Sequence, residues 1–269
     1  MMDHGPATAL DNADMNRRSF LKTLALSTAA GGLCSTPAWA IGPSSRLSIA
    51  MLRYAGNWNP RPNGLRKMLQ EVEKRTSIAV STRAVHADLS DRERLLEHPL
   101  MFWAGDSAVP NLTAQEVDHL RVYLKAGGTL VVDDASSDRN GIFERSVREQ
   151  LRRVLPTTPI QAVPRSHVLY KSFYLIPEPV GRIASAKKMD GLFNDDRAMV
   201  LISSNDLLGA WSRDSLGRYE FDVFPGGDRQ REMSYRLGIN IVMYALCLNY
   251  KEDQVHVPFI LKRRKWRVD

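Results

Sequence analysis

The chain has 269 residues, of which 43% are hydrophobic and 25% are charged, and its formal net charge is +7. This length and composition are typical of a globular protein with a full hydrophobic core, and they exclude a repeat or low-complexity chain. The modest positive charge favours solubility and does not indicate nucleic acid as a partner.

The first forty residues have the pattern of an export signal and are set aside from the fold. A modestly apolar run over residues 23–33 is too short to span a bilayer stably. Small residues at Ala38 and Ala40 then suit cleavage by a signal peptidase. We therefore expect a mature periplasmic protein that begins near Ile41, without a transmembrane span, after export by the twin-arginine machinery. The twin-arginine motif consists of Arg17, Arg18, Phe20, Leu21 and Lys22.

The mature chain opens with an apolar stretch over residues 47–54, which predicts the first strand. A loop with two prolines and a glycine follows, and it carries Asn57 and Trp58. Apolar residues then recur at helical spacing over 65–72, which predicts an amphipathic helix on one face of a sheet.

Two further strands are predicted in the first half of the chain. Residues 78–85 alternate in polarity and predict the second strand, with His86 at its end and Asp88 just beyond it. Residues 100–104 predict the third strand, which ends before Asp106.

The next helix and strand have clear boundary signals. Thr113 and Glu116 form the capping-box pattern that starts a helix, and Gly127 is expected to end that helix in a left-handed conformation. The β-branched and apolar run 129–132 then predicts a central strand buried on both faces. Asp133 and Asp134 follow it directly.

The second half is less regular. A helix is predicted over residues 143–155, followed by a proline-rich insertion over about 156–197 that contains His167. Long insertions in compact domains are usually functional or cover a site. Residues 198–203 predict another buried strand, and Asn205 and Asp206 follow it.

The chain closes with a predicted buried helix over residues 236–249 and a basic C-terminal tail over 251–269. Cys247 lies in the apolar part of this helix and would be the only cysteine after signal cleavage. We expect it to be a core residue, since one thiol cannot form an internal disulfide. The sequence contains no Cys-x-x-Cys or His-Glu-x-x-His zinc pattern and implies no particular cofactor strongly.

Strands that alternate with helices predict one doubly wound α/β domain over residues 41–250, with a mainly parallel, flavodoxin-like sheet. Ligands of such sheets bind at the carboxyl ends of the strands. Polar side chains follow each predicted strand and are candidates for a crevice that binds a polar ligand: Asn57, Trp58, His86, Asp106, Asp133, Asp134, Asn205 and Asp206.

Each of these residues alone also suits a turn or a helix cap. The pair Asp133 and Asp134 favours a site, because two adjacent like charges repel and a turn would be served better by Ser or Asn. If the protein is a catalyst, Asp133 or Asp134 is the candidate base or metal ligand, and His167 is the candidate assisting residue.

Several short motifs occur together along the chain: Tyr54-x-Gly56-x-Trp58-x-Pro60, Thr113-x-x-Glu116, Gly127-Gly128 with Asp133-Asp134, His167, Ser204-Asn205-Asp206 and Gly238-x-Asn240. In combination they resemble the bacterial family called domain of unknown function 4159. The resemblance covers nearly all of residues 46–250. It implies a flavodoxin-like sheet related to the class I glutamine amidotransferases. Members are often encoded near MoxR-type ATPases and von Willebrand factor A proteins, which implies a role in the cell envelope.

The chain departs from the amidotransferases at the nucleophile. Those enzymes carry a cysteine between glycines after a central strand, whereas this chain has Asp133-Asp134-Ala135-Ser136-Ser137 there. No flanking glycine permits the strained turn, so Ser136 or Ser137 with His167 as base makes a poor nucleophile.

Three interpretations remain open. The sequence favours a non-catalytic periplasmic module that binds a polar ligand or an envelope partner. The alternatives are a hydrolase acting on a carbohydrate or amide and a structural component of an envelope complex.

Overall fold

The computed structural model describes residues 46–83, 85–136 and 141–264, with side-chain surroundings up to residue 246. The predicted signal segment over 1–40, Ser137 and the side chain of Cys247 lie outside these described parts. None of the described helices combines the length and the apolar character needed to cross a membrane.

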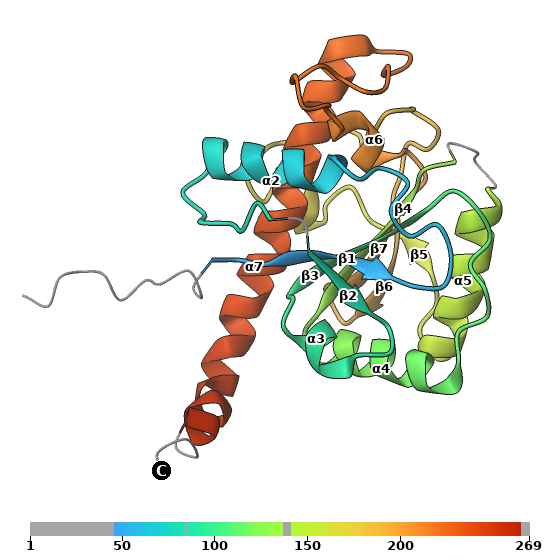
Figure 1. Ribbon diagram of the computed structural model, residues 1–269. Coiled ribbons are helices and arrows are strands. Elements are labelled where there is room, and N and C mark those ends of the chain that lie inside the picture. The colour runs from blue at the N-terminus through green and yellow to red at the C-terminus, as the bar shows by residue number, and fades with distance from the viewer. Residues whose placement is uncertain (1–45, 84, 137–140, 265–269) are drawn as a thin grey trace, which may run out of the picture. The chain divides into compact units, whose positions relative to one another are not determined.

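The domain is built on one seven-stranded sheet with the strand order β2-β1-β3-β4-β7-β6-β5 (Figure 1). The first five strands of that order are parallel, and β6 and β5 add an antiparallel edge. This arrangement confirms the predicted flavodoxin-like, mainly parallel α/β fold. The strands are β1 (Ile49–Arg53), β2 (Val85–Asp88), β3 (Leu100–Gly105), β4 (Thr129–Asp134), β5 (Gln161–Ala162), β6 (Asp190–Asn194) and β7 (Arg197–Ser203).

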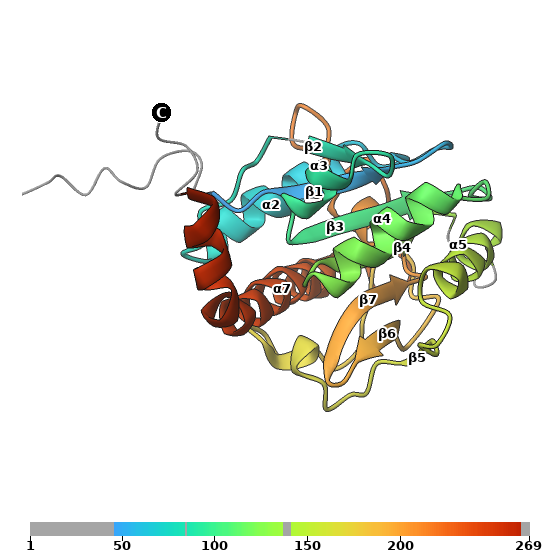
Figure 2. The same ribbon diagram turned by 90° about the horizontal axis from the view of Figure 1, so that it is seen from below.

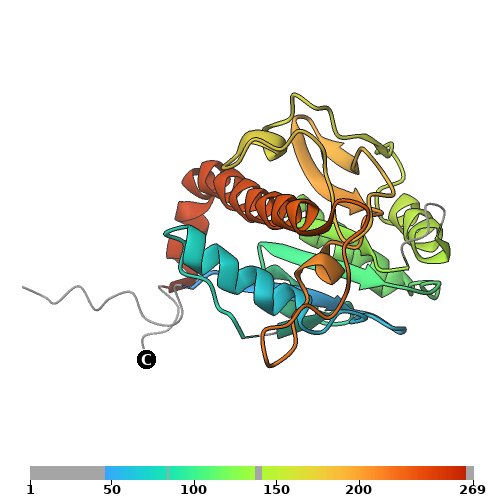
Figure 3. The same cartoon turned by 90° about the horizontal axis from the view of Figure 1, so that it is seen from above.

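Helices cover both faces of the sheet. Figure 3 shows α2 and α7 side by side over one face, and α6 packs against both of them. Figure 2 shows α4 and α5 over the opposite face, where α3 packs against α4. The helices are α2 (Gly64–Arg75), α3 (Arg92–Leu96), α4 (Ala114–Lys125), α5 (Ile142–Val154), α6 (Leu207–Trp211) and α7 (Gly227–Arg264), with a 3-10 helix η2 (Val168–Lys171).

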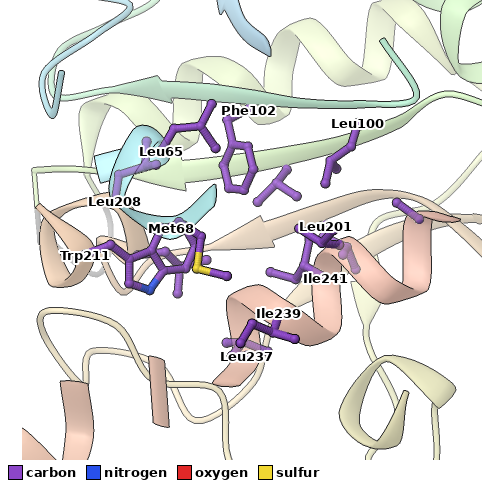
Figure 4. Packing of buried hydrophobic residues seen from close by; sticks show 14 of the residues in the cluster. Leu65, Met68, Leu100, Phe102, Leu201, Leu208, Trp211, Leu237, Ile239 and Ile241 are labelled. Carbon is purple, nitrogen blue, oxygen red and sulfur yellow. The ribbon is translucent and has the colours of Figure 1, made fainter. Parts of the chain in front are cut away.

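Each face has its own hydrophobic core, because the central strands are buried on both sides. Figure 4 shows the larger core, in which Phe102 of β3 and Leu201 of β7 meet Met68, Trp211 and Ile241 from the three covering helices. The ring of Phe102 contacts that of Trp211 edge to face, with the centroids 6.0 Å apart. Burial of such aromatic and aliphatic surface is the main stabilising term of the fold.

The predicted helix boundaries around α4 are confirmed. The side chain of Thr113 accepts a hydrogen bond from the amide of Glu116, and the Glu116 carboxylate accepts one from the amide of Thr113 at 2.8 Å. At the other end, Gly127 has φ 108°, and its neighbour Gly128 donates to the carbonyl of Tyr123. These caps fix where the chain enters β4.

The prediction of the second strand over residues 78–85 is wrong. Among the described residues of that stretch, Val80 forms an isolated bridge to Leu47, and the strand itself begins at Val85, the last residue of the stretch. The amide of Thr76 still bonds to the carbonyl of Val72 at the end of α2, so the residues that follow Thr76 connect the helix to the bridge at Val80. His86 and Asp88 are therefore residues of β2 and not of a following loop.

Three more boundaries differ from prediction. Asp133 and Asp134 are the last two residues of β4 and not the first two of a turn. The insertion over 156–197 contains β5, η2 and β6. In it, β6 pairs antiparallel to β7, and β5 pairs antiparallel to β6 as the edge strand of the sheet. The predicted helix over 236–249 is longer at both ends, since α7 spans Gly227–Arg264.

Candidate binding site at the carboxyl edge of the sheet

Asp133 connects the central strand to a short helix. It is fully buried, and its Oδ1 and Oδ2 atoms accept hydrogen bonds from the amides of Leu207 and Leu208 at 2.8 and 2.9 Å. These amides are at the start of α6, where backbone donors have no partner within the helix. Asp133 thus anchors α6 to the end of β4.

Asp206 lies beside Asp133 and is also fully buried. Its Oδ2 atom accepts from Arg61 at 2.8 Å and from the Nε of Arg182, and its Oδ1 atom accepts from the amide of Gly209. Arg61 also donates to the carbonyl of Ala135 at 3.0 Å. Three segments far apart in the sequence therefore meet at one carboxylate.

The burial of these acids alters their chemistry. Burial, followed by the nearby charge of Asp206, raises the pKa of Asp133 to about 8, against the opposing effect of the amides of Leu207 and Leu208. The two arginines on Asp206 supply opposite charge, with side chains only 15% and 20% exposed. The result is an internal charge cluster with no carboxylate surface open to solvent.

Asp134 and Glu144 are engaged next to this cluster. Asp134 accepts from the amide and the hydroxyl of Ser136 at 2.8 and 2.6 Å. Burial raises the pKa of Asp134, and the hydrogen bonds from Ser136 oppose that shift. Glu144 of α5 is buried, forms an ion pair with Arg148 and accepts from the hydroxyl of Ser204.

Asn205 fixes the insertion to the carboxyl end of β7. Its side chain accepts from the amide of Ala186 and donates to the carbonyls of Ala186 and Pro179. The backbone at Asn205 and Asp206 also accepts from the amides of Ile183 and Arg182. Asn205 is therefore a structural residue that positions the loop over 179–186.

Four of the predicted site residues form two contacting pairs near β1. At this point of the sheet, the strand order changes direction between β1 and β3. Asn57 donates to the Oδ2 atom of Asp106 at 2.8 Å, between the chain after β1 and the chain after β3. Trp58 contacts the ring of His86, with centroids 5.3 Å apart. Asn57, His86 and Asp106 are exposed. This is the switch point at which open α/β sheets commonly bind ligands.

His167 lies at the other end of the sheet. Its ring contacts Phe193 and Tyr244, and the hydroxyl of Tyr244 accepts from the amide of Ala198 at the start of β7. Asp133 is in register with Ser203, five residues further along β7, which corresponds to about 16 Å of strand. His167 therefore does not join Asp133 or Ser136 in one site. Burial lowers its pKa, and its Nδ1 caps η2.

A cavity of about 610 Å³ opens at the same carboxyl edge, beside the end of β7. One wall is the first half of α5, the opposite wall is the loop over 185–190, and Ile202 and Ser204 lie between them. Its charged lining residues are Glu144, Arg145, Arg148, Lys187, Lys188 and Asp190.

The sequence did not predict the basic residues at this edge. Arg61 lies between two prolines, a position that would have suggested a rigid loop with a functional arginine, and Arg182 follows a glycine within the insertion. Arg145 and Arg148 of α5 line the cavity, although neither was among the predicted site residues. Among the described residues, no group of three or more His, Cys, Asp or Glu side chains is arranged to hold a metal ion.

Comparison with the curated proteins finds no match. The family model described as domain of unknown function DUF4159 matches residues 48–246, which include the whole sheet and every edge residue described above. The chain belongs to this family.

Proposed function

We propose that this protein is an exported, non-catalytic module of the cell envelope that binds a polar ligand or an envelope partner at the carboxyl edge of its sheet. The observation that carries the proposal is that Asp133 is buried and serves as a hydrogen-bond acceptor inside the protein. Both of its carboxylate oxygens are bound by amides of α6, and the side chain is fully buried. A general base or metal ligand must instead reach the substrate or the ion.

The hydrolase alternative requires Asp133 or Asp134 to act together with His167. The position of His167 opposes that role, since it lies at the opposite end of β7. Asp134 is fully buried, and its Oδ1 atom accepts hydrogen bonds from Ser136. A binding role at the same edge is supported by the cavity beside β7 and by the exposed groups at the switch point.

The periplasmic location rests on the sequence. The arginine pair at Arg17 and Arg18, the short apolar run and the small residues at Ala38 and Ala40 occur in the order of a twin-arginine signal. That route carries proteins across the membrane already folded, which suits a domain with two cores and long-range pairing.

The test is a screen that detects binding and turnover together. Isotope-labelled protein is mixed with polar sugars, amino acids and peptides, and both its amide shifts and the ligand spectra are recorded. We expect reversible shifts at the carboxyl edge and no new product signals. Product formation that an Asp133→Asn variant abolishes while remaining folded would establish the hydrolase instead.

A further inference from the structure

We propose that the cavity between α5 and the loop over 185–190 binds a small anion, specifically a phosphate or carboxylate group on a hydroxylated skeleton. This inference rests on the proposed binding function and specifies its ligand. It concerns Arg145, Lys187 and Lys188, none of which belongs to the charge cluster around Asp133.

The charge of the lining favours an anion. Four basic and two acidic side chains line the cavity, which gives a net charge of +2. Both acids are already paired, because Arg148 bridges Glu144 and Asp190 with contacts of 2.6 and 2.5 Å. Arg145, Lys187 and Lys188 form no ion pair within the described parts of the chain.

The walls are held in place before any ligand arrives. Glu144 is bound both by Arg148 and by the hydroxyl of Ser204, which ties α5 to the end of β7. On the other side, Asn205 holds Ala186 through its amide and its carbonyl. Arg148 reaches Asp190 at the end of the loop, so both walls are connected across the cavity. Preorganised walls reduce the conformational cost of binding.

The lining also indicates a small, hydrophilic ligand. Ser185 and Ser204 contribute hydroxyl groups, and Ile202 is the only residue with a purely hydrocarbon side chain longer than alanine among those lining the cavity. A volume of about 610 Å³ accommodates a molecule of the size of a sugar phosphate or a uronic acid. Charge-assisted hydrogen bonds from arginine and lysine are the strong contacts available to such a group.

The test is calorimetric titration of the full-length protein, at low ionic strength, with four probes. Inorganic phosphate and glucose 6-phosphate report a phosphate site, glucuronate reports a carboxylate site, and glucose is the neutral comparison. The Lys187→Gln/Lys188→Gln double variant and the Arg145→Gln variant remove cavity charge. A Lys67→Gln/Lys74→Gln double variant on α2 removes the same charge from outside the cavity.

We expect at least one anionic probe to bind and glucose not to bind. The cavity variants should weaken anion binding about tenfold or more, the α2 variant should leave it unchanged, and added salt should weaken it. The three substituted cavity side chains are exposed, so the variants should retain the wild-type melting temperature.

Absence of anion binding, or equal binding by wild-type protein and cavity variants, would overturn the inference. If glucose or another neutral ligand then shifts amides at the carboxyl edge, the proposed binding function survives without the anion site. If the ligand screen also yields no shift there, the proposed binding of a polar ligand fails as well.

Discussion

Asp206 has an unusual backbone conformation, and its carboxylate contacts two arginine side chains. Its φ of 53° and ψ of 65° are left-handed, a conformation that Asp and Asn adopt more readily than most residues. Its buried carboxylate faces Arg61 and Arg182, and Arg61 also lies over the ring of Phe221 at 4.2 Å. One acid therefore pairs with two cations that reach it from different loops.

An Asp206→Asn variant tests these ion pairs without altering the preference for the left-handed backbone conformation, which Asp and Asn share. It leaves Arg61 and Arg182 facing each other at a buried position, so we expect a loss of about 3 kcal/mol in the free energy of unfolding. Urea unfolding measures it. The matched control is Asp118→Asn, which breaks an exposed pair with Arg121 and should cost less than about 1 kcal/mol. Equal losses in the two variants would refute the assigned role of Asp206.

At the scale of helices and strands, the sequence predicts best those elements whose boundaries depend on neighbouring residues or on complete burial. The capping box at Thr113, the left-handed Gly127 and the apolar runs of β3, β4 and β7 are all confirmed, because each depends on neighbouring residues or on complete burial. These signals were sufficient to predict the parallel centre of the sheet.

The short elements near the edges of the sheet were missed or predicted at the wrong residues, and this also has a physical reason. β2 has four residues and only Ala87 is fully buried, so its sequence shows little periodicity. β6 exists because β7 offers it a pairing edge, and α6 has five residues whose first amides are held by Asp133. Tertiary contacts define such short elements, and no local pattern reveals them.

The candidate site shows the same division. Sequence correctly placed Asn57, Asp106, Asp133 and Asp206 at or next to strand ends, since strand ends are visible in the hydrophobic pattern. The arginine partners of Asp206 and the separation of His167 from Asp133 depend on the three-dimensional path of the insertion, which the sequence pattern does not contain.

At the scale of the whole molecule, export can be separated from folding. An Arg17→Lys/Arg18→Lys variant keeps the positive charge of the signal segment but removes the arginine pair on which the motif depends. We expect wild-type protein in the periplasmic fraction and the variant retained in the cytoplasm, with the same melting temperature after purification. Equal periplasmic amounts of the two proteins would contradict export by the twin-arginine route.

The central claim is that Asp133 anchors α6 and is not a reactive group. Replacement by Asn places a side-chain NH₂ group, which cannot accept a hydrogen bond, opposite one of the two backbone amide donors. We expect this change to lower the free energy of unfolding by about 1 to 3 kcal/mol. The pKa of Asp133 is raised to about 8, so between about pH 4 and pH 8 the folded chain holds a proton that the unfolded chain has lost. The contribution of Asp133 to stability therefore falls as pH rises through that range, whereas Asn does not titrate.

The most direct measurement is urea unfolding of wild-type protein and the Asp133→Asn variant at about pH 5 and about pH 9. An Asp106→Asn variant at an exposed position of the same edge serves as the control. The anchor role predicts that the Asp133→Asn variant has a lower free energy of unfolding than wild type at the lower pH. This difference in free energy should become smaller at the higher pH. The control variant should have the same free energy of unfolding as wild type at both pH values. An Asp133→Asn variant as stable as wild type at the lower pH, or more stable, would contradict the account and indicate an acid retained for chemistry.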